Sequence, residues 1–247
     1  MTASTSSAGP FKYFAFLKRR AGLSTDEFLD QWENGHARFF ADTPEVRRHI
    51  RRYELYPRIA GDEDRARTDV EVPDAGFDGV AVQWFDTRAD LQALQAEPSY
   101  QAFAAADQPD YRDPLTLGVL TRAPEVIVGP PGGRSDAGMS LICILRRKAG
   151  LELGEFHDHW LHHHGGLFQT IPELHDPLLG YEQNHGTDLP DAAFDGVTQQ
   201  WFASLPAWVE SLQVPSHRDV VEPDVASFLD LESMAFIVAT PPIVVIA

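Results

Sequence analysis

The sequence predicts an α+β protein made of two copies of one unit joined by a short linker. Two segments repeat: "EFLDQWENGH" at 27–36 returns as "EFHDHWLHHH" at 155–164, and "PDAGFDGVAVQWF" at 73–85 returns as "PDAAFDGVTQQWF" at 190–202. Between the copies, "GPPGGRSDAG" has the glycine and proline content of a linker. We therefore expect a disordered tail at 1–10, a first unit at 11–128, the linker at 129–138 and a second unit at 139–247.

Each unit begins with an apolar segment of strand length, "FKYFAFL" at 11–17 and "SLICIL" at 140–145. A helix should follow, from Thr25 to about Asp42 in the first copy. Ser24 is its expected N-cap, and Glu27 would complete a capping box. The second copy has Glu152 at the cap position.

The rest of each unit predicts a second strand near Tyr53 or Tyr181 and a third strand in the repeat that ends in Trp-Phe. Shorter helices are expected at 88–96 and 206–214, and final strands at 124–128 and 241–247. This β-α-β-β-α-β order is the ferredoxin-like pattern. Helices cover one face of such a sheet and the other face still needs cover. We expect the two units to pack as an intramolecular, pseudo-dimeric α+β barrel.

Composition narrows the class of protein. The net charge of −17 argues against nucleic acid and anionic membrane surfaces as partners. No segment has the roughly 18 continuous apolar residues of a membrane span, and the first residues do not resemble a signal peptide. A single cysteine, Cys143, fits a reducing compartment, so we expect a cytoplasmic protein. Nucleotide-binding glycine motifs and the GxSxG motif of serine hydrolases do not occur.

The repeated helix carries a histidine at the end of its apolar face. Phe28, Trp32 and His36 recur at helical spacing, and Phe156, Trp160 and His164 repeat them. Two interpretations remain open. The imidazole could be a core group that holds the helix end through a hydrogen bond. Alternatively, it could lie at the rim of a pocket and move a proton at neutral pH.

These residues resemble the EthD-domain family of the dimeric α+β barrel superfamily. The similar motifs are K/R-x-x-x-G-L, E-F-x-x-x-W-x-x-x-H and F-D-G-V-x-x-x-W-F, in the same order in both copies. The resemblance implies a mostly apolar cavity and small enzymes that usually need no cofactor. It also implies that the helix histidine has an acidic partner before the last strand, at Asp107 or Asp113 in copy one and at Asp224 or Asp230 in copy two.

The expected catalytic groups are therefore His36 and His164 with Asp107 and Asp224, and Tyr53 and Tyr181 as further proton donors. Ordinary core packing competes with a cavity role for the large aromatic residues. The candidates for substrate binding are Tyr13, Trp32, Trp84, Trp160 and Trp201.

The second copy is rich in histidine, and His159 and His163 have the i, i+4 spacing of metal ligands. Two ligands without a third are a weak signal, so we predict no metal and no cofactor, with haem or a metal as the alternative. The expected ligand is a small hydrophobic molecule. We expect a monomeric pseudo-dimer, with further pairing into a homodimer left open.

The function predicted for this chain is cofactor-independent proton transfer on a small aromatic or polyketide-like carbonyl compound. Cyclisation with dehydration, another lyase step, or isomerisation would each use the histidine as general base or acid. One alternative is an oxygenase of the same superfamily, cofactor-free or haem-dependent. The other is a protein that binds a hydrophobic ligand without turnover.

Overall fold

The computed structural model describes residues 10–59, 76–107, 111–113, 117–187 and 192–247. The chain divides into two compact units. Unit 1 contains Met1–Pro57, Gly76–Ala123 and Pro242–Ala247, and unit 2 contains Arg58–Ala75 and Pro124–Pro241. Most of the expected tail lies outside the described residues.

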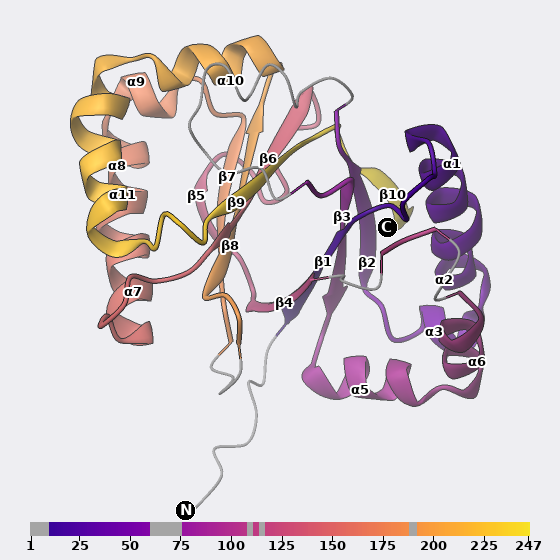
Figure 1. Ribbon diagram of the computed structural model, residues 1–247. Helices are drawn as coiled ribbons and strands as arrows, with labels where there is room; N and C mark the ends of the chain where they lie inside the picture. Colours follow the sequence, from indigo (N-terminus) through magenta and orange to yellow (C-terminus); the bar gives the residue numbers. More distant parts are fainter. Residues whose placement is uncertain (1–9, 60–75, 108–110, 114–116, 188–191) are drawn as a thin grey trace, which may run out of the picture. The chain divides into compact units, whose positions relative to one another are not determined.

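Unit 1 has a five-stranded antiparallel sheet in the order β10-β2-β3-β1-β4. Its strands are β1 (Phe11–Leu17), β2 (Arg52–Pro57), β3 (Gly79–Phe85), β4 (Leu117–Arg122) and β10 (Ile243–Ile246). Its helices are α1 (Thr25–Asp30), η1 (Gln31–Ala37), α2 (Arg38–Asp42), α3 (Pro44–Arg47), α5 (Arg88–Ala96) and α6 (Pro98–Asp107). The helices lie on one face of the sheet (Figure 1).

Unit 2 repeats this architecture with the strand order β5-β7-β8-β6-β9. Its strands are β5 (Glu125–Val128), β6 (Met139–Leu145), β7 (Gly180–His185), β8 (Gly196–Phe202) and β9 (Ala235–Ala239). Its helices are α7 (Leu153–Asp158), η2 (His159–His164), α8 (Gly165–Thr170), α9 (Pro172–His175), α10 (Leu205–Leu212), η3 (His217–Val221) and α11 (Glu222–Phe228). The predicted α+β class with two ferredoxin-like units is confirmed.

One expectation about the strands is wrong. The segments at 124–128 and 241–247 were expected to be the final ferredoxin-like strand of each unit, but β4 and β9 hold that position beside β1 and β6. The expected segments form β5 and β10, which are fifth strands at the edge of a sheet. Each pairs in the sheet of the other copy: β5 joins β7, and β10 joins β2. If the chain is divided at the linker, each half therefore contributes one edge strand to the sheet of the other half.

The long helix of each unit begins as the sequence predicts. The Ser24 side chain accepts a hydrogen bond from the Glu27 N–H, and the Glu27 carboxylate accepts the Ser24 N–H at 2.8 Å. In the second copy, the Glu155 carboxylate accepts the N–H of Glu152 at 3.2 Å. Each helix then widens to π-helical geometry, at η1 and η2. Such wide turns are rare and often occur at functional sites.

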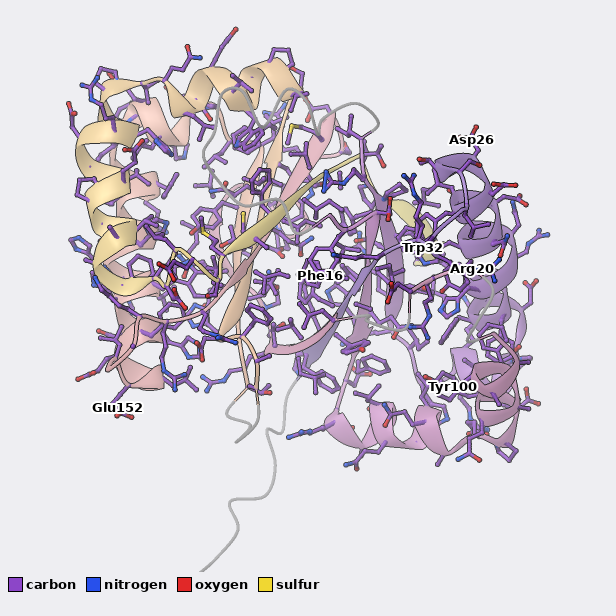
Figure 2. The ribbon with its side chains drawn as sticks, viewed as in Figure 1. Phe16, Arg20, Asp26, Trp32, Tyr100 and Glu152 are labelled. Carbon is purple, nitrogen blue, oxygen red and sulfur yellow. The ribbon has the colours of Figure 1, made fainter. Side chains whose placement is uncertain are left out.

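A tryptophan from each widened helix fixes the helix to its sheet. Trp32 is fully buried in the core of unit 1 (Figure 2). An added Cβ at Gly79 would collide with the Trp32 ring, and one at Gly196 would come within 2.5 Å of the Trp160 ring. The glycine of the repeated F-D-G-V motif therefore gives the indole room to lie against the backbone of β3 or β8.

Among the described residues, none of the helices combines the length and apolarity that a bilayer span requires.

Candidate functional site

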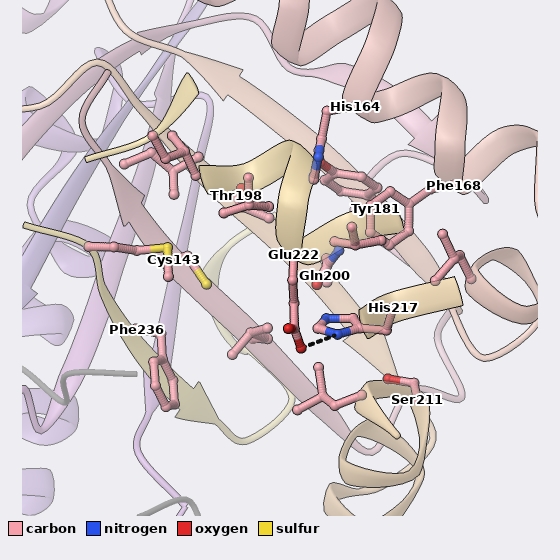
Figure 3. Close-up of a pocket in the computed structure, with 18 of the residues that line it drawn as sticks. Cys143, His164, Phe168, Tyr181, Thr198, Gln200, Ser211, His217, Glu222 and Phe236 are labelled. Carbon is pink, nitrogen blue, oxygen red and sulfur yellow. Dashed lines mark ion pairs between the residues drawn. The ribbon is translucent and has the colours of Figure 1, made fainter. Parts of the chain in front are cut away.

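Unit 2 has a partly open cavity of about 700 Å³ between its sheet and its helices (Figure 3). Strands contribute the floor because alternate residues of a strand point to the same face. On β8, Thr198, Gln200 and Phe202 line the cavity. The remaining wall is mostly apolar and aromatic, with Trp160, Phe168, Tyr181, Trp208 and Phe228 among its residues. A cavity of this size and composition suits a small, largely hydrophobic molecule.

His164 stands at the end of η2 and lines this cavity. Its Nδ1 lies 2.8 Å from Oδ2 of Asp224, on α11. Because an ionised carboxylate only accepts hydrogen bonds, Nδ1 carries the proton and Nε2 is left as the acceptor of the ring. The His164–Asp224 pair therefore has the arrangement of a general base and the group that orients it.

Electrostatics favour this assignment of protons. Burial lowers the pKa of His164 below its ordinary value, although the hydrogen bond to Asp224 opposes the shift. Burial alone would raise the pKa of Asp224, but hydrogen bonds from His164 and His159 outweigh it, and the pKa is lowered. At neutral pH the pair is thus a neutral imidazole beside a carboxylate.

A second histidine and carboxylate face the same cavity. His217 Nδ1 lies 3.5 Å from Oε1 of Glu222, and both side chains line the cavity wall (Figure 3). Burial lowers the pKa of His217, and the charge of Glu222 opposes this shift. This pair was not predicted from the sequence. A difference between the copies could have indicated it: unit 1 has Tyr100 and Ala105 at the positions of His217 and Glu222.

Unit 1 places aromatic rings around its own helix histidine. The His36 ring lies 5.1 Å from Phe40, 5.4 Å from Phe103 and 5.5 Å from Tyr111, measured between ring centroids. Phe39 stacks on Phe103 at 3.8 Å. In unit 2 these two phenylalanines are replaced by Leu167 and Val220. The region that corresponds to the cavity of unit 2 is therefore rich in aromatic side chains in unit 1.

In the second copy, one of the two acidic candidates lies beside the helix histidine. In unit 2, Asp224 contacts His164, whereas the Asp230 backbone N–H donates to the Arg146 carbonyl. In unit 1, Asp107 is the last residue of α6, and its side chain lies outside the described residues. Asp113 donates its backbone N–H to the carbonyl of Lys18.

The two tyrosines on the second strands are deeply buried. Tyr181 lines the cavity, and its hydroxyl accepts a hydrogen bond from Gln183 at 3.1 Å. Burial raises the pKa of Tyr181, so the hydroxyl stays protonated. Tyr53 is fully buried in the core of unit 1, where it packs edge-on against Phe40.

The candidate aromatic residues fall into two groups. Trp160 lines the cavity and stacks on His185, with ring centroids 4.7 Å apart. Trp201 is one residue out of phase with Gln200 and Phe202, so it points to the opposite face and packs against Gly133 and Gly180. In unit 1, Trp84 lies under Lys12 and Arg52, and Trp32 and Tyr13 pack in the core cluster.

Cys143 also lines the cavity, from the middle of β6. Burial raises the pKa of its thiol to about 12. The thiol is therefore protonated at neutral pH and a poor nucleophile.

The fold and this cavity define a ferredoxin-like protein with a buried histidine–aspartate pair at the wall of a mostly apolar cavity. The EthD domain profile matches residues 20–114 and 148–232, once in each copy. The chain belongs to the EthD-domain family. A comparison with curated proteins gives no significant match.

Solved structures with the same fold cover both copies. An anthrone oxidase-like protein matches with a TM-score of 0.64 and 10% identity, over 95% of this chain and 91% of that chain. A protein from Fusobacterium nucleatum subsp. nucleatum, named "putative monooxygenase", gives 0.55 and 6%, over 97% and 95%. A mutant chlorite dismutase from Candidatus Nitrospira defluvii gives 0.51 and 14%, over 96% and 93%. At these identities the likeness concerns the fold.

Proposed function

We propose that the cavity of unit 2 is the active site of an enzyme that moves protons on a small hydrophobic carbonyl compound. The observation that carries this proposal is the His164–Asp224 pair at the wall of a mostly apolar cavity. A neutral imidazole oriented by a carboxylate can remove a proton α to a carbonyl, and such groups typically contribute about 10²–10⁴-fold to a rate.

His164 can both take and return the proton. In a cyclisation with dehydration, a base takes a carbon-bound proton and an acid protonates the hydroxyl that leaves as water. His164 would become an imidazolium beside Asp224 when it takes the carbon-bound proton, and it would then pass that proton to the leaving hydroxyl. His217, whose pKa is lowered by burial, would offer the substrate a neutral hydrogen-bonding group in the same cavity. The hydroxyl of Tyr181 and the amide of Gln200 are polar groups in the same wall that can hydrogen-bond a developing enolate oxygen.

Cavity composition argues for chemistry without haem. The two propionates of a haem carry negative charge and need cationic or strongly donating partners. The described residues that line the cavity include neither lysine nor arginine, and Glu222 would add a further negative charge. The residues present do not fit a haem, and no step of the proposed reaction uses one.

A cofactor-free oxygenase is the second candidate. The anthrone oxidase-like protein and the protein named as a monooxygenase share the fold over most of both chains. The same base could ionise an electron-rich phenol or anthrone to an anion with charge on a ring carbon. Oxygen would add to that carbon and, with a proton, give a hydroperoxide, and loss of water from the hydroperoxide would leave a quinone. Oxygen consumption during turnover distinguishes this route from a lyase or isomerase reaction.

Exchange of carbon-bound hydrogen tests the shared proton-transfer step without knowledge of the final product. The full-length protein is incubated in D₂O with aromatic β-dicarbonyl compounds and anthrones, and loss of the α-proton signal is followed by NMR. We expect exchange that falls at least about 100-fold in His164→Ala. His36→Ala compares the equivalent histidine of unit 1. Because aromatic rings surround His36, we expect exchange to stay within about twofold of wild type.

Two results would overturn the proposal. One is equal exchange by wild type and a folded His164→Ala protein. The other is saturable binding of the compounds to the cavity with no exchange and no product, which is the behaviour of a ligand-binding protein without turnover.

A further inference from the structure

We propose that His159, His163 and Asp224 form a binding site for a divalent transition-metal ion at Oδ1 of Asp224, the carboxylate oxygen that does not contact His164. The two histidines belong to the widened helix segment η2, and Asp224 comes from α11. One ligand atom from each residue lies within 4.8 Å of the other two. Neither histidine lines the cavity, so this inference goes beyond the proposed reaction and does not depend on it.

The distances suit a small ion. Nε2 of His163 lies 3.4 Å from Oδ1 of Asp224, and Nε2 of His159 lies 2.7 Å from the same oxygen. Ligand atoms about 2.0–2.2 Å from a zinc ion in tetrahedral geometry are roughly 3.3–3.6 Å apart. The His163 separation already meets this condition. The His159 separation is that of a hydrogen bond, and it must widen by less than an ångström when a metal replaces the shared proton.

The ligand types select the class of metal. Two imidazoles and one carboxylate suit Zn²⁺, Co²⁺, Ni²⁺ or Cu²⁺, whereas Mg²⁺ and Ca²⁺ prefer sets of oxygen ligands. Water would complete the coordination. Asp224 would then contact the metal through Oδ1 and keep its 2.8 Å contact with His164 through Oδ2. The hydrogen bond from His164 would orient the ligating carboxylate and raise its affinity for the metal.

The ligands are held in place and remain reachable. The Asp224 side chain is only 6% exposed, and the His159 ring packs against Phe228 with centroids 4.7 Å apart. The His163 side chain is 63% exposed, which leaves a path for an ion to enter. Unit 1 has Gln31 and Gly35 at the positions of the two histidines, so the three-ligand set belongs to the second copy alone.

Cobalt titration of the tag-free, full-length protein tests this site. After treatment with a chelator, Co²⁺ is added, d–d absorption between about 500 and 650 nm is followed, and Zn²⁺ is used to displace it. We expect one tight site, with His163→Ala and His159→Ala each raising the Kd at least tenfold.

His162→Ala is the matched control, because His162 is an exposed neighbour that contacts Asp158 rather than Asp224. It should change the Kd by less than twofold, and circular dichroism should show that all three variants are folded. The proposal is overturned if neither Co²⁺ nor Zn²⁺ binds with a Kd below about 100 µM, because weaker binding is expected of scattered surface histidines. Equal losses in His162→Ala and His163→Ala would overturn it as well, because they would indicate diffuse binding to the histidine-rich surface.

Discussion

Replacing Gly196 by alanine should strain the wall of the cavity in unit 2. The added methyl would lie 2.5 Å from Cζ3 and 2.9 Å from Cη2 of the Trp160 ring, and 3.1 Å from the Asn184 carbonyl oxygen. Ordinary contacts between carbon atoms are about 3.5–4.0 Å, so the ring must move by roughly 1 Å. Trp160 is 1% exposed and stacked on His185, so a shift of its ring disturbs this stacking and changes the cavity wall.

Overpacking of a well-filled core costs about 1–3 kcal/mol, and we expect a value in the middle of that range for Gly196→Ala. For a chain of 247 residues this corresponds to a fall in Tm of about 2–4 °C per kcal/mol. Trp160→Phe removes the two ring atoms that the methyl would meet. The double variant Gly196→Ala/Trp160→Phe should therefore be more stable than the sum of the two single effects, by about 1–2 kcal/mol.

Urea denaturation followed by circular dichroism measures these free energies of unfolding. Gly166→Ala provides a matched control in the same unit, because a Cβ there meets no other atom within 4 Å. Alanine at this helical position should be neutral or stabilising by up to about 1 kcal/mol. Strict additivity in the double variant, or a Gly196→Ala protein as stable as wild type, would refute the steric argument.

Three further predictions concern other parts of the chain. Burial lowers the pKa of His217 in the folded state, so its contribution to stability is present above the unfolded pKa of about 6.5 and is lost as the pH falls through the folded pKa. The Tm of His217→Gln should therefore decrease less than the Tm of wild type between pH 7.5 and 5. Parallel Tm curves for the two proteins would contradict this. The Cys143 thiol, whose pKa burial raises to about 12, should react with iodoacetamide at pH 8 at least tenfold more slowly in the native than in the urea-unfolded protein. Ser24→Ala removes the acceptor for the Glu27 N–H and should cost about 0.5–2 kcal/mol in unfolding free energy, whereas an unchanged urea midpoint would argue against the cap.

Local patterns predicted the elements whose residues decide their own structure. The first strands, the extent of the long helix from Thr25 to Asp42 and the cap at Ser24 were predicted correctly. The exchange of β5 and β10 was not predicted, because an apolar edge strand has the same pattern in whichever sheet it joins. The widened segments η1 and η2 were also missed, since no residue type marks a π-helical turn.

Residues of the candidate site could be predicted where both copies carry them. The helix histidine and its acidic partner were named before any contact was known, but only the fold shows that Asp224 rather than Asp230 faces His164. His217 has no histidine counterpart in the first copy, so a search for repeated residues passes over it. Trp201 was named for its size, although its position on β8 places it on the face opposite the cavity.

The exchanged edge strands impose an order on synthesis and folding. β10 follows all the other described elements along the chain, yet it pairs with β2, the second strand of unit 1. Until a ribosome has made residues 243–246, β2 must carry an unpaired edge, and exposed edges favour association with other chains. Unit 1 is therefore made first but can be completed only after unit 2 has been synthesised, and a nascent chain halted at the linker should be prone to aggregation.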